Sequence, residues 1–256
     1  MDTEKVRRYF ERIGMTMPDI IIPDGEFLDR IHYMHSISVP YENLDLFTGK
    51  VYPTDADTAY CNVVLNHRGG MCLDLNTLFG WLLEEIGYGV EYVGSYMSDL
   101  PETSIRWHKV LRVTDCNGLK WWCDVARTKS NVKHPFLMEP LFIQEYDGET
   151  YRFEKDSDDS WSLWLLAGNE WVKKFEASDW NVTVEETNVQ KYTTVPRFPD
   201  HAIVTCRYFE IHTPFGRRSL HGNIYRESFN NMVYKFNCSD ETLPWAYAQF
   251  GLGGYI

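Results

Sequence analysis

The stretch His67-Arg68-Gly69-Gly70-Met71-Cys72-Leu73-Asp74-Leu75-Asn76 sets two glycines, which permit close backbone approach, just before a cysteine. Apolar residues then recur at helical spacing, at Leu75, Leu78, Phe79, Leu82, Leu83 and Ile86. Cys72 is therefore predicted at or near a helix start, where the partial positive charge of the helix N-terminus favours the thiolate, the reactive form of cysteine. A buried structural cysteine is the alternative interpretation.

Two amphipathic helices are predicted before this stretch, over residues 3–13 and 27–35. Residues 39–45 follow them and are predicted to form a loop around Pro40. Glu42 lies in that loop between apolar neighbours, and an inward-facing carboxylate needs a cation or several hydrogen-bond donors. Arg68 is a plausible partner for Glu42, and a solvated loop glutamate is the alternative.

Beyond residue 88 the hydrophobic pattern takes the period of two that is typical of strands, over residues 90–96 and 106–113. Asn117-Gly118 is the strongest short hairpin signal, and the returning strand is predicted over residues 119–125. A turn centred on this pair sets Asp124 opposite Leu111 and a few residues along from His108. Further strands are predicted over residues 142–145, 149–154, 161–165, 170–175 and 202–211.

This order of elements indicates an α+β chain, with a helical first third, a β-rich middle and a mixed end. The chain has 256 residues, 44% of them hydrophobic, which is ample for a full core. A net charge of -12 without a basic block argues against nucleic acid or an anionic membrane as a partner. No glycine-rich phosphate loop follows a strand and opens a helix, so nucleotide chemistry is not expected.

The cysteines are scattered along the chain, with no Cys-x-x-Cys pair and no Cys/His spacing suited to zinc. We therefore expect free thiols in a reducing compartment and no metal site. The N-terminus is charged and precedes no apolar signal segment, and no apolar run is long enough to cross a bilayer. The sequence thus predicts a soluble cytoplasmic protein.

Cys72, His108 and Asp124 follow one another in the order needed for a thiol nucleophile, a base that ionises it and an acid that orients the base. A histidine on a strand is also typical of a core or surface position, and Asp124 could be an acid at a strand end. Spacing alone leaves these alternatives open.

Other motifs surround these three residues. Val39-Pro40-Tyr41-Glu42-Asn43-Leu44 precedes the cysteine stretch, and Trp107-His108-Lys109-Val110-Leu111 and Cys123-Asp124-Val125 follow it. Thr213-Pro214-Phe215-Gly216-Arg217-Arg218 forms a late strand-turn motif. In order, spacing and residue type, the motifs resemble the arylamine N-acetyltransferase family, including its amide synthase relatives. The resemblance covers nearly the whole chain, and a random chain would rarely carry all of these motifs in register.

The resemblance implies three parts around a cysteine-protease-like core: a helical bundle over residues 1–88, a β-barrel over 89–188 and an α/β lid over 189–256. It implies ping-pong transfer of an acyl group, with acetyl the expected one, from acyl-CoA to an amine through a cysteine thioester. By matching position, Cys72 is the nucleophile, His108 the general base and Asp124 its orienting partner. Glu42 and Arg68 form a supporting ion pair beneath the site. The implied partners are a small amine acceptor and acetyl-CoA or another acyl-CoA as cosubstrate, with no bound cofactor.

The sequence departs from the family pattern near the nucleophile. Met71 stands where an aromatic residue is usual and Asp74 where a longer acid or amide is common, so we expect a reshaped pocket wall beside Cys72. Val125-Ala126-Arg127-Thr128 replaces a glycine-aromatic-glycine run near the acyl and CoA-binding region. Arg127, followed by Thr128, could contact a carboxylate or phosphate of the donor or acceptor. A surface arginine is the alternative.

Three other functions compete with CoA-dependent transfer. An amide synthase of the same fold would take its acyl chain from an acyl carrier protein or another thioester. A binding protein of the same fold would have lost the chemistry, although Cys72, His108 and Asp124 are all chemically competent. A hydrolase would use water in place of the amine in the second step.

Overall fold

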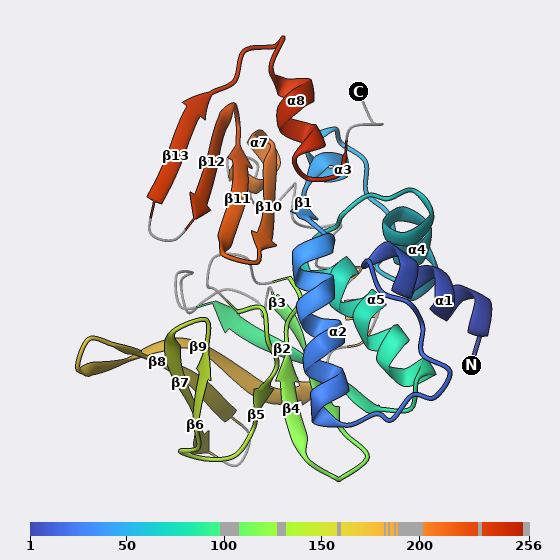
Figure 1. Cartoon of the computed structure of the whole chain (residues 1–256), viewed down its shortest axis with the longest axis vertical. Coiled ribbons are helices and arrows are strands. Elements are labelled where there is room, and N and C mark those ends of the chain that lie inside the picture. Colours follow the sequence, from blue (N-terminus) through green and yellow to red (C-terminus); the bar gives the residue numbers. More distant parts are fainter. Residues whose placement is uncertain are drawn as a thin grey trace.

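The chain forms a group of helices and two antiparallel sheets, as Figure 1 shows for a computed structural model of the whole sequence. The structure describes residues 1–97, 108–126, 132–157, 160–181, 183, 185–186, 188, 202–229 and 232–252. Helix α2 (Gly25–Ser38) runs beside the larger sheet and leads to the smaller one, which contains the C-terminal strands. Helices segregated from antiparallel strands make this an α+β fold, as the sequence predicts.

The predicted N-terminal helices are confirmed. They are α1 (Thr3–Arg12) and α2, and the other helices of this part are α3 (Leu44–Phe47), α4 (Ala56–Tyr60), the π-helical turn η1 (Cys61–Leu65) and α5 (Cys72–Glu85). Helix α2 begins two residues before its predicted start because the Asp24 side chain accepts the N–H of Phe27 at 2.8 Å. Apolar side chains of α1, α2 and α5 are buried together in one cluster, which includes Val6, Phe10, Leu28, Ile31, Leu75, Leu78, Phe79 and Leu82.

The larger sheet has eight strands in the order β5-β4-β3-β2-β9-β8-β7-β6. Their bounds are β2 (Gly89–Met97), β3 (His108–Thr114), β4 (Lys120–Cys123), β5 (Phe136–Leu137), β6 (Ile143–Tyr146), β7 (Glu149–Ser157), β8 (Ser160–Ala167) and β9 (Glu170–Asn181). Alternate residues of β3 face opposite ways, so Leu111 joins the cluster of the helices while Val110 packs with Trp122 in a second cluster. Strand β3 therefore carries core residues on both faces and fixes the sheet against the helices.

The predicted closed β-barrel is wrong, because the edge strands β5 and β6 do not pair with each other in the part of the chain that the structure describes. The Gln144 side chain on β6 accepts the N–H of Leu137 at 2.7 Å and donates to the Leu137 carbonyl at 2.9 Å. These bonds occupy backbone groups of β5 that a neighbouring strand would otherwise pair with. Side-chain contacts rather than a backbone ladder thus join the two edges, and the sheet stays open.

The predicted register of the β3–β4 hairpin is wrong by one residue, since Leu111 pairs with Cys123 rather than with Asp124. The turn is closed by the Gly118 N–H, which donates to the Asp115 carbonyl at 3.0 Å. Gly118 has φ +79°, the left-handed conformation of the last residue in a three-residue hairpin loop. The prediction assumed a two-residue turn, and the additional loop residue shifts the pairing along the returning strand.

The smaller sheet has the order β1-β10-β11-β12-β13 and carries two short helices. Its elements are β1 (Tyr41–Glu42), α7 (Ala202–Thr205), β10 (Tyr208–Thr213), β11 (Gly216–His221), β12 (Ile224–Phe229), β13 (Met232–Asn237) and α8 (Leu243–Ala248). Since β1 comes from the N-terminal third, the chain enters this sheet early and returns to it late. The domain boundaries at residues 88 and 188 stay a prediction.

Two predictions on this sheet are corrected. The loop predicted over residues 39–45 contains β1, which pairs with β10 through Tyr41 and Glu210, and the start of α3. The strand predicted over residues 202–211 begins with helix α7 and becomes a strand only at Tyr208. In both cases the stabilising partner lies more than 150 positions away in the chain. Strand β1 pairs with β10, and the Ile203 carbonyl of α7 accepts the side-chain amide of Asn43 at 2.6 Å.

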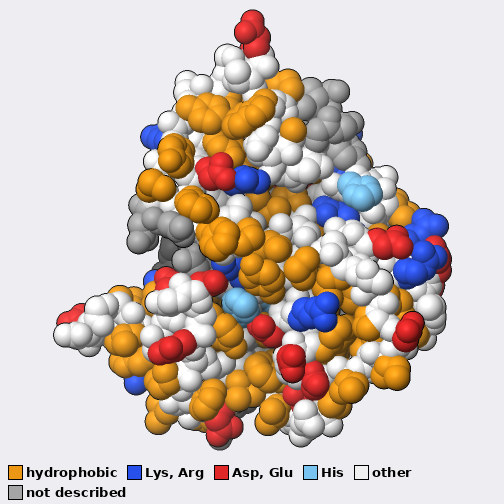
Figure 2. All heavy atoms as spheres, in the orientation of Figure 1, with side chains coloured by type: hydrophobic (Ala, Val, Ile, Leu, Met, Phe, Trp, Pro, Cys, Tyr) orange, Lys and Arg blue, Asp and Glu red, His pale blue; other side chains and the backbone are white. Residues whose placement is uncertain are grey.

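The surface view in Figure 2 shows basic side chains scattered among acidic ones, with no basic patch on this face. Apolar side chains gather over the smaller sheet, where all six residues of the edge strand β13 are exposed. Within the described ranges, no helix has both the length and the apolar character needed to cross a membrane.

Candidate active site

Two loops meet where the chain approaches Cys72. The N–H of Glu42 donates to the Gly70 carbonyl at 3.0 Å, and the N–H of Gly70 donates to the Pro40 carbonyl at 3.4 Å. A Cβ atom on Gly69 would lie 2.1 Å from the Pro40 carbonyl oxygen, so this approach requires glycine. The glycine pair of the sequence therefore brings the loop that precedes α5 against β1.

Cys72 is the first residue of α5, as the sequence predicts. Met71 caps the helix, and its N–H donates to Asp74 Oδ2 at 3.1 Å. This carboxylate in the first turn stabilises the helix start and fixes where the chain turns into it.

The structure brings Cys72, His108 and Asp124 together. His108 is the first residue of β3, and Asp124 follows the last residue of β4. His108 Nε2 lies 2.5 Å from Asp124 Oδ2, and the Cys72 side chain hydrogen-bonds His108. Because Nε2 faces the carboxylate, Nδ1 is the ring nitrogen that remains for the thiol. The side chains of His108 and Asp124 are 5% and 0% exposed, so this contact is shielded from water.

The surroundings of His108 favour its protonated form. Burial alone lowers the pKa of the imidazole, but the Asp124 carboxylate and the contact with Cys72 outweigh it and raise the pKa to about 10. At neutral pH the ring is therefore an imidazolium, and this cation lies against the Cys72 side chain.

Asn76 holds the Asp124 carboxylate, a role that the sequence motif alone does not assign. Its Nδ2 donates to Asp124 Oδ1 at 2.9 Å and to the Lys109 carbonyl at 2.6 Å. Its Oδ1 accepts the N–H of Val125 at 3.1 Å. Asn76 lies four positions after Cys72, which sets both on one face of α5, and this spacing is the signal that could have identified it.

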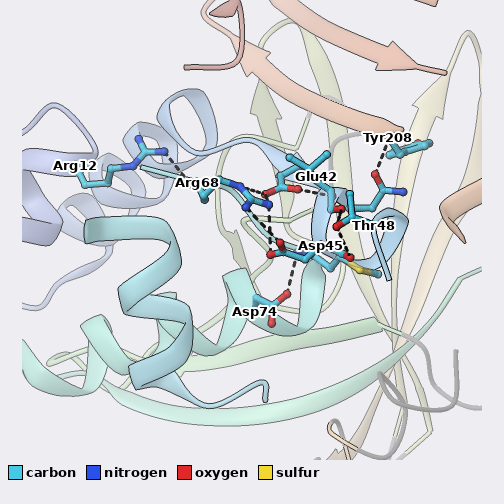
Figure 3. A network of polar contacts seen from close by, with 10 residues as sticks. Arg12, Glu42, Asp45, Thr48, Arg68, Asp74 and Tyr208 are labelled. Atoms are coloured by element: carbon cyan, nitrogen blue, oxygen red, sulfur yellow. Dashed lines mark hydrogen bonds and ion pairs between the residues drawn. The ribbon is translucent and has the colours of Figure 1, made fainter. Parts of the chain in front are cut away.

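Glu42 and Arg68 form an ion pair, which Figure 3 shows. Arg68 Nε and Nη2 lie 2.9 and 2.6 Å from Glu42 Oε1, and the N–H of Leu44 donates to Oε2 at 2.6 Å. Burial raises the pKa of Glu42, and the attraction to Arg68 opposes that rise. Asp45 also contacts Arg68, at 3.3 Å. The guanidinium thus offsets two carboxylates under the start of α5.

Two further side chains tie this ion pair to the rest of the molecule (Figure 3). Arg12 of α1 donates to the Arg68 carbonyl at 3.2 Å and to the Ser38 carbonyl at 2.8 Å. Asn43 accepts the N–H of Tyr208 at 2.7 Å and so anchors β10 next to Glu42. The sequence pattern assigns neither residue a role, because their partners come from distant segments.

Met71 and Asp74, the two departures from the family pattern, line a small cavity next to this ion pair. Glu42 and Asp45 line the same cavity, so three carboxylates border it. The expected effect of Met71 and Asp74 on the pocket wall beside Cys72 stays a prediction.

Arg127 and Thr128, the predicted donor or acceptor contacts, lie outside the described residues. The described residues include no group of three or more His, Cys, Asp or Glu side chains that could hold a metal ion. All six cysteines are free thiols.

Comparison with known proteins bears on the identity of this site. Residues 24–249 match a family model described as N-acetyltransferase. A Salmonella typhimurium protein described as arylamine N-acetyltransferase / N-hydroxyarylamine O-acetyltransferase is 25% identical, over 98% of this chain and 90% of its own length.

Solved structures agree on the fold. A cysteine-to-glutamine variant of Mycobacterium smegmatis N-arylamine acetyltransferase superposes with a TM-score of 0.85 at 24% identity, covering 98% of this chain and 92% of that one. Mycobacterium marinum arylamine N-acetyltransferase in complex with CoA gives a TM-score of 0.81 at 24% identity, covering 97% and 93%. With a family model that spans residues 24–249, the chain belongs to the arylamine N-acetyltransferase family, a family of acetyltransferase enzymes.

Proposed function

We propose that this protein moves an acetyl or other acyl group from acyl-CoA to a small amine by a ping-pong mechanism through a thioester on Cys72. Membership of the arylamine N-acetyltransferase family supports acetyl transfer to an amine. The Mycobacterium marinum neighbour in complex with CoA supports a CoA thioester as the donor. The observation that carries the mechanism is the buried contact of His108 with Asp124 at 2.5 Å. The Cys72 side chain is hydrogen-bonded to the same imidazole ring.

In the first half-reaction, the Cys72 thiolate attacks the carbonyl carbon of the acyl-CoA. Backbone N–H groups at the start of α5 stabilise the negative charge on the carbonyl oxygen. The bond between carbonyl carbon and CoA sulfur then breaks, and the His108 imidazolium gives its proton to the leaving sulfur. The products are free CoA and an acyl thioester on Cys72, with His108 neutral.

In the second half-reaction, the amine nitrogen attacks the thioester carbonyl. His108 takes the proton that the amine loses, and Asp124 stabilises the imidazolium that forms. The bond to the Cys72 sulfur breaks, which releases the amide and restores the thiolate and imidazolium. Glu42 and Arg68 support the site without touching the reacting atoms, and Arg127 and Thr128 contact the donor or acceptor.

Intact-protein mass spectrometry tests the first half-reaction. The protein is exposed briefly to a panel of CoA thioesters without an amine, with Cys72→Ala as the control. We expect an adduct of the acyl mass that maps to Cys72 in the parent and is absent in the variant, whose circular dichroism spectrum stays that of the parent. Release of this adduct by an added arylamine, with formation of the amide, then tests the second half-reaction.

The competing functions give different results in the same assay. An adduct from a carrier-protein thioester but from no CoA thioester would identify an amide synthase. Rapid loss of the adduct in water alone would identify a hydrolase. No adduct from any donor, in a folded protein whose Cys72 reacts with iodoacetamide, would identify a binding protein of this fold.

A further inference from the structure

His32 on α2 is fully buried and lies between two backbone groups. Its Nε2 accepts the N–H of Asp124 at 3.2 Å, and its Nδ1 lies 2.8 Å from the Lys133 carbonyl oxygen. A backbone N–H can only donate and a carbonyl can only accept, so the ring carries its proton on Nδ1 and is neutral. His32 therefore links the main chain of Asp124 to the segment that contains Lys133.

The neutral state of His32 agrees with its surroundings. Burial lowers its pKa to about 4. The titratable groups around the ring are Asp29 and His35 on the same helix, and His134 and Asp124 on neighbouring segments. Asp29 is hydrogen-bonded to His134, with Asp29 Oδ1 2.7 Å from His134 Nδ1. Protonation of His32 would turn Nε2 into a donor that faces the N–H of Asp124, so this contact requires the neutral ring.

The Lys133 side chain reaches the smaller sheet from the same segment. Its buried ammonium lies 3.4 Å from the Thr213 carbonyl, 3.1 Å from the Pro214 carbonyl and 3.0 Å from Asp147 Oδ2. Thr213 and Pro214 lie at the turn between β10 and β11, in the late motif of the sequence. Lys133 thus contacts this turn through its side chain and contacts His32 through its backbone carbonyl.

We propose that His32 is a positioning residue for Asp124, and that Lys133 connects this position to the turn between β10 and β11. Asn76 holds the carboxylate of Asp124 from one element, while His32 holds its backbone from another. A shift of the Asp124 main chain would lengthen the contact between its carboxylate and His108. The carboxylate would then stabilise the protonated His108 ring less. The inference rests on the proposed function, because it assigns His32 a part in orienting the base.

The test compares two buried histidines of α2. Both rings pack against Phe79, with centroids 5.6 Å away for His32 and 5.5 Å for His35. His35 is hydrogen-bonded to the Tyr9 hydroxyl and not to Asp124. The variants are His32→Phe, which keeps an aromatic ring and loses both hydrogen bonds, and His32→Gln, which retains a donor and an acceptor. His35→Phe is the matched control, and Lys133→Met removes the ammonium but keeps the carbonyl.

The rate of Cys72 acylation by acetyl-CoA is measured against pH for each variant. We expect His32→Phe to slow acylation by roughly 10- to 100-fold, with an unchanged half-saturating concentration of acetyl-CoA. The basic limb of the profile should move to lower pH, since His108 loses part of its stabilisation by Asp124. His32→Gln should recover part of the rate, Lys133→Met should move the limb in the same direction, and His35→Phe should keep the parent profile.

The inference is overturned if His32→Phe keeps the parent profile or changes it no more than His35→Phe does. If His32→Phe does not fold, parent-like profiles in both His32→Gln and Lys133→Met overturn it equally. Alkylation of Cys72 by iodoacetamide at pH 6 needs no acyl donor, and we expect it to slow in the His32 variants. A parent that alkylates but takes no acyl group therefore contradicts the proposed function, while slower alkylation in His32→Phe than in His35→Phe still supports the inference.

Discussion

Arg68 is the cation that offsets the charge of the buried Glu42 carboxylate. The side chain of Glu42 is only 2% exposed, and that of Arg68 is 12% exposed. Removing one partner of such a pair leaves a charge in the interior without compensation, which costs far more than the pair itself contributes. Replacing only one of the two residues should therefore lower the free energy of unfolding more than replacing both.

We expect Arg68→Met to lower the free energy of unfolding by about 3–5 kcal/mol, measured by urea denaturation. Arg8→Met is the control, because Arg8 pairs with Glu4 on the exposed face of α1 and should change stability by less than about 1 kcal/mol. Adding Glu42→Gln to Arg68→Met should restore part of the loss. Equal effects of the Arg68 and Arg8 variants would contradict this account of the ion pair.

The contact of His108 with Asp124 predicts a specific pH dependence. Because the folded pKa of His108 is about 10 and its ordinary value is about 6.5, its contribution to stability is complete below pH 6.5 and is lost as pH rises through 10. Asp124→Asn removes the carboxylate, so burial then lowers the pKa of His108. We expect kcat/KM to fall roughly 10³- to 10⁴-fold. An unchanged pH profile of kcat/KM in this variant would remove Asp124 from the mechanism.

At the scale of elements, the approach of β1 to the loop before α5 depends on Gly69. A side chain there would meet the Pro40 carbonyl at 2.1 Å and would separate the two loops. We expect Gly69→Ala to destabilise the fold by about 1–3 kcal/mol and to slow acylation of Cys72. Gly89→Ala is the control, since a Cβ there would meet only ordinary contacts, the nearest at 3.4 Å. Thermal unfolding and the mass-spectrometric assay measure both effects.

Sequence patterns predicted the elements whose determinants are local. The helix starting at Cys72 and the hairpin at Asn117-Gly118 follow from periodicity and turn chemistry within a few residues. Strand β1 and helix α7 could not be predicted in this way, because β10 and Asn43, which stabilise them, are distant in sequence.

The same distinction holds for the site. Residue type and order make Cys72, His108 and Asp124 candidates, since the chemistry requires them in this order, and the resemblance to the family implies their roles. His32 and Asn76 carry no such signature, since a buried histidine or asparagine becomes informative only when its hydrogen-bond partners are known. The roles of the three residues in catalysis stay a prediction until the acyl adduct is measured.

At the scale of the whole molecule, the buried histidines of α2 should make the fold sensitive to acid. Burial lowers the pKa of His32 to about 4 and lowers that of His35 as well. The unfolded chain therefore binds more protons between pH 6.5 and 4, so the free energy of unfolding falls as pH falls through this range. His32 alone accounts for a loss on the order of 3 kcal/mol.

Urea denaturation at several pH values between 7 and 4 measures this slope. We expect His32→Phe and His35→Phe each to flatten it, because an aromatic ring without a titratable group cannot take up the proton. His67→Asn is the control, since His67 is exposed and asparagine tolerates its left-handed conformation with φ 52°. If the free energy of unfolding varies with pH in both α2 variants as it does in the parent, other groups cause the acid sensitivity.

The pairing of β1 with β10 has a consequence for the order in which the protein is made. Tyr41 leaves the ribosome about 170 residues before its partner Glu210, a delay on the order of ten seconds or more at ordinary translation rates. The nascent chain therefore contains Cys72 and both of its proposed partners well before the C-terminal strands are synthesised. The contacts of Lys133 with the Thr213 and Pro214 carbonyls can therefore form only late in synthesis, long after the segment that contains Lys133 has been made.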